Sequence, residues 1–381
     1  MKPSDATSAT QDLFIKLGPK YLDQSALRFV SGGPSETGFM LEHKFDKIIY
    51  TGGGRVGRII AQAAAKHLTP VTLELGGQAP SIVCKSANID LAAKRIAAAK
   101  LNNNGQICIN TNHVLVDPSI HDQFVERMIH WTKTFIGDTE GSGLSHIVNE
   151  NHFNRIKNLL DNTTGNIKYG GKTDASSNYI HPTIITDVNF QDSTMSEEIF
   201  GPLTPVIRST TPQAIDTINS MPHPLAIYIF SSNAAEIEHI LHSTTSGGAT
   251  VNDVMMHVAV PSAPFGGVGE SGNGATKGKI GFDACSHTRT VVTIPAFFEY
   301  LLAFKYLPYS DKNKKLLAVK PSFKKSETLE MQKVGDGGVR KFITRAAMLA
   351  LIVAALDRGS GGRIGFVRYL GETVTRFRAK L

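Results

Sequence analysis

The stretch "KIIYTGGGRVGRIIAQAAAKHLTPVTLELGG", residues 47–77, indicates the fold class of this chain. It runs from an apolar strand through a glycine turn into an alanine-rich helix, and then into a second strand. Residues 52–57, GGGRVG, fit the G-x-G-x-x-G pattern, whose glycines let a pyrophosphate approach the backbone at a helix N-terminus. The pattern predicts a dinucleotide site, and a tight turn that binds nothing is the alternative.

Similar alternation of strands and helices follows this stretch. It continues from residue 79 to 136 and again from 180 to 290. Such alternation predicts an α/β fold with parallel strands. We place the boundary between its two units near Gly76 and Gly77.

The composition fits a soluble globular enzyme, with 41% hydrophobic and 19% charged residues. The net charge of +7 comes from the C-terminal tail, because residues 311–381 hold 16 Lys and Arg against 6 Asp and Glu. The rest of the chain is slightly acidic, so we expect no nucleic-acid partner. Three widely spaced cysteines, without a zinc-binding spacing, favour a reducing, cytoplasmic location.

Two side chains are candidates for covalent chemistry. Cys108 lies in the glycine-containing loop "NNNGQICIN", residues 102–110, where backbone N–H groups could favour its thiolate. Glu74 ends a strand and could activate water as a general base, whereas a literal dinucleotide-binding interpretation assigns it to a ribose hydroxyl. A lone cysteine is more often a small buried hydrophobe, and we interpret Cys84 and Cys285 in that way.

Two later segments have the composition of functional loops. "MSEEIFGPLTPV", residues 195–206, places two acids before a Gly-Pro turn, and a solvated helix cap is the alternative. "APFGGVGESGNGATKG", residues 263–278, is rich enough in glycine to be a loop. Its apolar start predicts that it packs on the body of the protein.

Several collinear segments resemble the aldehyde dehydrogenase superfamily, and most closely its class 3 and fatty-aldehyde branch. The resemblance extends from residue 1 to about residue 293. Its matching segments are "KPSD", the stretch from "YTGGG" to "LELGG", "NNNGQICIN", "EEIFGPLTPV", "LAIYIFSSN", "TSGGATVNDVMMHVAVPSAPFGGVGESGNG" and "SHTRTVV".

This resemblance implies an aldehyde dehydrogenase-like fold and a set of site residues. Cys108 is implied as the nucleophile and Glu74 as the general base. The implied cofactor-binding residues are Lys2, Asp5, Thr51, Gly52, Gly53, Gly57, Glu198 and Phe200, and the implied substrate-binding residues are Asn252 and His257. No metal is implied.

The implied reaction is the oxidation of medium- or long-chain aldehydes to carboxylic acids with NAD, or alternatively NADP. It passes through a thiohemiacetal and a thioester on Cys108, and Glu74 activates the hydrolytic water. The backbone N–H of Cys108 is one implied donor to the oxyanion.

The second oxyanion donor of the family is an Asn in a W-N-[YF]-P segment upstream of "KPSD". Because this sequence opens with "MKPSD", it does not include that segment. We therefore expect a partial Rossmann-type cofactor domain at residues 1–76, followed by an α/β catalytic domain at 77–285. The alternative function is a truncated, catalytically impaired fragment that binds cofactor weakly or associates with full-length subunits.

The remaining residues are expected to serve assembly and location. We predict an oligomerisation strand and linker at 286–310, with a homodimer formed through residues 286–293. Residues 311–381 form a basic tail, which predicts peripheral association with an intracellular anionic membrane. A protein that works at a membrane surface through this tail is a further hypothesis.

Overall fold

The computed structural model describes residues 1–137 and 143–318. Its largest sheet has seven strands in the order β11-β10-β3-β4-β9-β8-β5. The bounds of these strands, in that order, are Gly248–Val251, Ala226–Phe230, Pro80–Val83, His113–Val116, Leu203–Arg208, Thr183–Thr186 and Asn166–Tyr169. Neighbouring strands are parallel except β5, which is antiparallel to β8.

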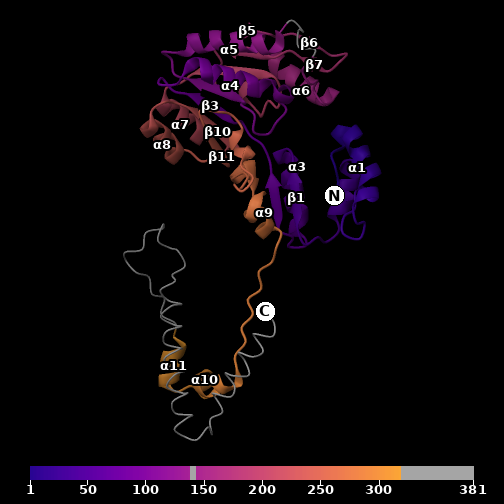
Figure 1. The fold of residues 1–381 in the computed structure, drawn as a ribbon, viewed down its shortest axis with the longest axis vertical. Helices are drawn as coiled ribbons and strands as arrows, with labels where there is room; N and C mark the ends of the chain where they lie inside the picture. Colours follow the sequence, from indigo (N-terminus) through magenta and orange to yellow (C-terminus); the bar gives the residue numbers. More distant parts are fainter. Residues whose placement is uncertain (138–142, 319–381) are drawn as a thin grey trace. The chain divides into compact units, whose positions relative to one another are not determined.

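Helices cover both faces of this sheet (Figure 1). The α-helices are α1 (Ser8–Tyr21), α2 (Pro34–Leu41), α3 (Gly54–Ala65), α4 (Ile89–Leu101), α5 (His121–Ile136), α6 (Glu150–Asp161), α7 (Thr211–Ser220), α8 (Ala234–Ser243), α9 (Gly278–Ala284), α10 (Glu299–Leu302) and α11 (Asp311–Leu317). The short 3-10 helices are η1 (Asp5–Thr7), η2 (Asn102–Gly105), η4 (Ser193–Met195), η5 (Met256–Ala259), η6 (Gly269–Ser271), η7 (Ala296–Phe298) and η8 (Ala303–Lys305).

Two buried hydrophobic clusters hold these layers together. One joins α4 and α5 to one face of the sheet, through residues such as Ile96, Phe124 and Tyr228. The other joins α6, α7 and α8 to the opposite face, through residues such as Phe153 and Ile215. The predicted α/β fold with parallel strands is confirmed.

A second, smaller sheet carries the glycine turn. Its order is β1 (Ile48–Thr51), β2 (Val71–Glu74) and β12 (Gly272–Asn273). β1 is parallel to β2, whereas β12 is antiparallel to it and comes from a distant part of the chain. The third strand therefore lies beyond residues 1–76, the range that we predict for the cofactor domain. β6 (Thr173–Asp174) and β7 (Tyr179–Ile180) form a separate two-stranded sheet.

Residues 1–289 form one compact unit, and the unit that begins at Thr290 is described separately. Residues 286–293, predicted as an oligomerisation strand, pair with no strand within residues 1–137 and 143–318. A strand requires the edge of another strand, so the predicted homodimer would have to supply that edge.

The structure corrects the interpretation of one cysteine. Cys84 is buried, as expected, but Cys285 is exposed at the end of α9. In residues 1–137 and 143–318 no helix is both long and apolar enough to cross a membrane. Residues 319–381, which hold most of the predicted membrane-associated tail, lie outside the described residues.

Candidate active site

Cys108 follows η2 at the end of α4, where the backbone makes an unusually tight bend. Asn103 and Asn104 adopt left-handed φ angles of 49° and 50°, and Gly105 has a φ of 79°. A side chain on Gly105 would place its Cβ 2.1 Å from the carbonyl oxygen of Gly201, so only glycine fits there. This close approach brings the Cys108 loop against the loop that follows Glu198.

The Cys108 thiol lies between opposing electrostatic influences. Burial raises its pKa, and the nearby carboxylates of Glu198 and Glu74 raise it further. Backbone N–H groups of Cys108 and Ile109 donate toward the sulfur and lower the pKa. The thiol therefore lies within electrostatic reach of both acids, which the sequence places 34 residues before it and 90 residues after it.

Glu74 ends β2, the central strand of the small sheet, and its carboxylate is buried. One carboxylate oxygen, Oε1, accepts a hydrogen bond of 3.2 Å from the Thr276 hydroxyl. Burial raises the pKa of Glu74, whereas that hydrogen bond and the charge of Lys277 lower it. A carboxylate with a raised pKa is a stronger base than a solvated one, which suits the activation of water.

The Glu198 carboxylate, the second acid near the thiol, packs against two glycines. The backbone N–H of Gly77 donates to its Oε2 at 3.1 Å, and a Cβ on Gly76 would lie 2.2 Å from the same oxygen. The absence of a side chain at Gly76 thus leaves the space that this carboxylate occupies. Burial raises the pKa of Glu198 to about 7, which the Gly77 hydrogen bond partly offsets.

Sequence reasoning missed Lys100, a buried lysine within electrostatic reach of Glu198. Its Nζ donates to the carbonyl oxygen of Thr111 at 2.8 Å. Burial lowers the pKa of Lys100 to about 7, and the charge of Glu198 opposes that change. The available signal was its spacing, because Lys100 follows Ile96 by four residues on the apolar face of α4.

Two further residues that sequence reasoning missed hold the Glu198 loop in place. The Arg155 guanidinium donates to the carbonyl oxygens of Glu198 and Ile199, at 3.0 Å and 2.7 Å. The Asn112 side chain accepts a hydrogen bond of 2.8 Å from the N–H of Ile199. The next residue, Phe200, has a left-handed φ of 46°, a conformation that such anchoring can maintain.

The glycine turn leads into α3 as predicted, and its geometry fits a phosphate group. A Cβ on Gly53 would meet nothing within 4 Å, so the backbone there is open to a ligand. In the described part of the chain, no side chain caps the N-terminus of α3, which leaves N–H donors for an anion. Gly57 has a different role, because it packs against Leu75. Thr51, at the end of β1, is exposed beside Gly52.

The remaining predicted cofactor residues, Lys2 and Asp5, lie beside another pair of glycines. Lys2 Nζ donates to the carbonyl oxygens of Pro3 and Gly32, at 2.9 Å and 2.7 Å. The Asp5 carboxylate lies 3.3 Å from the Cβ position of Gly33. These two side chains thus come together near the N-terminus of α2, and their contact with a cofactor remains a prediction.

The two predicted substrate residues differ in whether all their polar side-chain atoms have hydrogen-bond partners. The Asn252 amide donates to the carbonyl of Ser231 and accepts from its N–H, both at 3.0 Å, which ties β10 to the end of β11. His257 Nδ1 lies 2.9 Å from the Thr250 hydroxyl, and its buried Nε2 has no partner within the described residues. Phe265 stacks on the His257 ring. His257 therefore keeps a free polar atom, whereas Asn252 has a clear structural role.

A half-buried thiol within electrostatic reach of Glu74 and Glu198, beside an open glycine turn on an α/β fold, is the arrangement expected of one class of protein: enzymes with a cysteine nucleophile and a bound nucleotide. The Aldehyde dehydrogenase family model matches residues 1–291. The chain therefore belongs to the aldehyde dehydrogenase family.

Individual relatives support this assignment. The rat protein "Aldehyde dehydrogenase, dimeric NADP-preferring" is 44% identical over 312 residues, which are 81% of this chain and 68% of the relative. Rat "Aldehyde dehydrogenase family 3 member A2" is 43% identical over 314 residues, 82% of this chain and 64% of the relative. A solved structure, the substrate-bound state of Staphylococcus aureus AldH, is 34% identical with a TM-score of 0.72, covering 80% of this chain and 70% of that one. The chain spans about two thirds of the length of these relatives.

Proposed function

We propose that this protein oxidises aldehydes to carboxylic acids with a nicotinamide dinucleotide, and that Cys108 is the nucleophile. The observation that carries the proposal is the position of the Cys108 thiol within electrostatic reach of both Glu74 and Glu198. Membership of the aldehyde dehydrogenase family supports it.

The first step forms a bond between Cys108 and the aldehyde. The thiolate sulfur adds to the carbonyl carbon, and the carbonyl electron pair becomes an oxyanion. The N–H groups of Cys108 and Ile109, which donate toward the sulfur, favour the thiolate. The Cys108 N–H is also our proposed donor to the oxyanion, where a single donor contributes on the order of 3 kcal/mol.

The second step removes a hydride from the former aldehyde carbon, which leaves a thioester on Cys108. A nicotinamide dinucleotide, when bound, would supply the hydride acceptor. The proposed phosphate site is the open turn at Gly52 and Gly53, and Glu198 and Phe200 are proposed to hold the nicotinamide end. Arg155 supports this arrangement because it fixes the backbone of the Glu198 loop.

In the last step, Glu74 takes a proton from water, and the resulting hydroxide attacks the thioester carbon. The carbon–sulfur bond then breaks, and the carboxylic acid leaves. Since the base must be ionised, hydrolysis is lost as the pH falls through the pKa of Glu74. That pKa is raised by burial, so the loss begins above the pH range of an ordinary glutamate.

The finer parts of the proposal concern substrate, assembly and location. We propose medium- or long-chain aldehydes as substrates, with His257 near the entry to the site. One of the rat relatives is named as a dimer, and we propose a homodimer through residues 286–293 here. We also propose a cytoplasmic protein whose basic tail associates with a membrane surface.

The test combines turnover with the reactivity of the thiol. Wild-type protein is expected to form NADH or NADPH from a fatty aldehyde, and Cys108→Ala is expected to abolish this, with Cys285→Ala as the exposed-cysteine control. Glu74→Gln is expected to stop product release and yet speed iodoacetamide labelling of Cys108 near neutral pH, because a carboxylate that raises the thiol pKa is gone. Full turnover by Cys108→Ala would contradict the proposal.

A further inference from the structure

The loop that follows β12 folds back onto the small sheet and reaches the carboxylate of Glu74. β12 places Gly272 opposite Glu74 in the antiparallel pair. Thr276 and Phe265 then exchange two backbone hydrogen bonds, of 2.6 Å and 3.0 Å, which close the loop. The side chains of Thr276 and its neighbour Lys277 are thereby fixed beside the end of β2.

The Thr276 hydroxyl distinguishes the two oxygens of the Glu74 carboxylate. It lies 3.2 Å from Oε1 and at the same distance from the carbonyl oxygen of Phe265, so its single proton is shared between these two acceptors. Oε2 is buried and has no hydrogen-bond partner among residues 1–137 and 143–318. An unpaired buried carboxylate oxygen is costly, which indicates that a water or another ligand completes it.

Lys277 supplies a positive charge near the same carboxylate. Its Nζ donates to the carbonyl oxygen of Val258 at 2.7 Å and lies 5.1 Å from the centre of the Phe265 ring. Its backbone has a left-handed φ of 69°, so the tight loop fixes the direction in which its side chain leaves the backbone. The charge of Lys277 lowers the pKa of Glu74, and it lowers that of His257 as well.

We propose that Thr276 and Lys277 are positioning residues for Glu74: Thr276 fixes Oε1, Lys277 favours the ionised carboxylate, and Oε2 is left to take the proton from water. This inference rests on the proposed function, in which Glu74 is the general base. Neither residue carries a signal in the sequence beyond its place in a glycine-rich loop.

Other groups around Glu74 do not duplicate these two roles. The Cys108 thiol is also within electrostatic reach of Glu74, and the Glu198 carboxylate contacts Gly76 and Gly77. On the sheet itself, β1 places Thr51 and β12 places Gly272 beside Glu74, and neither of these titrates. Among the described residues, Lys277 is the cation whose charge acts on Glu74.

The test follows the ionisation of Glu74 directly and in parallel with turnover. Protein labelled with carboxyl-¹³C glutamate is titrated by NMR, and Glu74→Gln identifies the resonance. Thr276→Val removes the hydroxyl at nearly constant volume and is expected to raise the pKa of Glu74 by roughly half to one pH unit. Lys277→Met is also expected to raise the pKa of Glu74, whereas Thr276→Ser, which keeps a hydroxyl, is expected to give the wild-type pKa.

Thr72→Val is the matched control. Thr72 is buried on the same strand as Glu74, and within the described chain its hydroxyl has no partner, so its loss is expected to leave the Glu74 titration unchanged. The acidic limb of the pH–kcat profile is expected to move upward with the titration in Thr276→Val. It stays in place in Thr72→Val.

The positioning role of Thr276 and the proposed reaction are contradicted by different results. An unchanged Glu74 titration in Thr276→Val would overturn the positioning role, whatever the turnover. A shifted titration in a protein whose wild-type form produces no NADH or NADPH would support the positioning role and overturn the proposed reaction. A shift of equal size in Thr72→Val would overturn the inference, because it would reflect general repacking of β2.

Discussion

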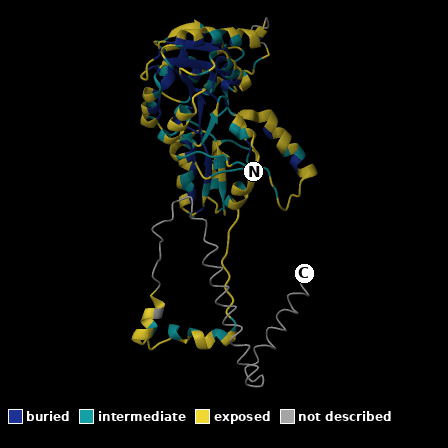
Figure 2. Ribbon diagram, turned by 60° about the vertical axis from the view of Figure 1, so that its left-hand side comes forward, coloured by how far each residue is buried: buried dark blue, intermediate teal, exposed yellow. Residues whose placement is uncertain are grey.

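The inner strands of the seven-stranded sheet and the edge strand β1 of the three-stranded sheet differ in how accessible they are to solvent. β3, β4, β8 and β10 are buried along their whole length, whereas β1 alternates between half-buried and exposed residues (Figure 2). The large sheet packs helices on both faces, through two extensive clusters. The small sheet has one cluster with three buried members, Ile60, Leu73 and Leu75.

This difference separates the rigid part of the site from the part that is open to a ligand. The Cys108 and Glu198 loops extend from elements of the large sheet, and Arg155 and Asn112 anchor the Glu198 loop by hydrogen bonds to its backbone. Glu74 and the glycine turn belong to the small sheet. We therefore expect substitutions in the two sheets to act differently, on stability in the large one and on ligand binding in the small one.

The largest expected contrast is between two isoleucines on strands. Ile229 in β10 is 0% exposed, and Ile229→Ala is expected to destabilise the protein by about 2–5 kcal/mol through loss of contacts and a residual cavity. Ile49 in β1 is 53% exposed, and Ile49→Ala is expected to change stability by less than about 0.5 kcal/mol.

Urea unfolding measures both changes. Fluorescence of Trp131, the single tryptophan, reports on α5 and the large sheet, and circular dichroism reports on the whole chain. Equal losses in the two variants would contradict the contrast between the sheets.

A smaller contrast is expected within the glycine turn itself. Gly57→Ala would place a Cβ 2.8 Å from Leu75, and overpacking this small core is expected to cost about 1–2 kcal/mol. Gly53→Ala would meet nothing within 4 Å and is expected to cost less than about 0.5 kcal/mol. Thermal unfolding followed by circular dichroism compares them, and a larger loss in Gly53→Ala would reverse the assignment of packing and ligand-facing glycines.

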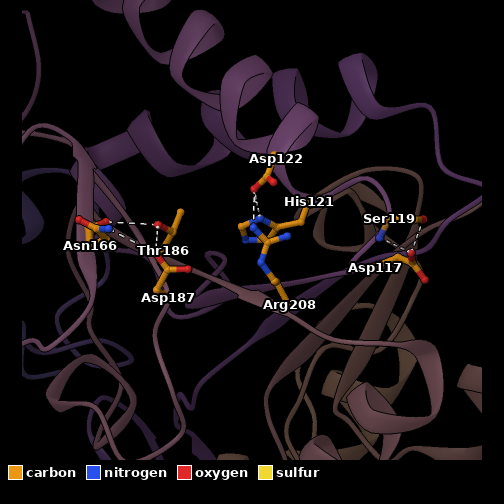
Figure 3. A network of polar contacts seen from close by, with 8 residues as sticks. All are labelled: Asp117, Ser119, His121, Asp122, Asn166, Thr186, Asp187 and Arg208. Carbon is orange, nitrogen blue, oxygen red and sulfur yellow. Dashed lines mark hydrogen bonds and ion pairs between the residues drawn. The ribbon is translucent and has the colours of Figure 1, made fainter.

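The smallest contrast concerns two arginines with different partners. Arg155→Met removes both donors to the Glu198 loop and is expected to weaken nucleotide binding roughly tenfold, about 1.4 kcal/mol. Arg208→Met is the control, because Arg208 pairs with Asp122 in a polar cluster next to His121 (Figure 3). Isothermal titration calorimetry with NAD measures both affinities, and equal weakening by Arg208→Met would show that Arg155 acts through general stability.

The alternation of strand and helix patterns was sufficient to predict the α/β fold, since apolar periodicity and glycine turns are local properties of the chain. The start of α4 is a local feature of the same kind, because Asn88, a residue type favoured at helix starts, accepts the N–H of Leu91 at 3.0 Å. The pattern could not show that β12 joins the small sheet. Pairing between β2 and a two-residue strand about 200 residues away depends on the folded path of the intervening chain.

The sequence by itself also determined the candidates for the chemistry, Cys108 and Glu74, because their motifs occur in a specific order along the chain. The tertiary structure alone decided which other groups surround them. Thr276 lies 202 residues from Glu74 in the sequence and donates to its carboxylate, and the charge of Lys100, in α4, acts on Glu198. Such pairs form only when strands from separate segments come into register, and no local pattern of residues records that register.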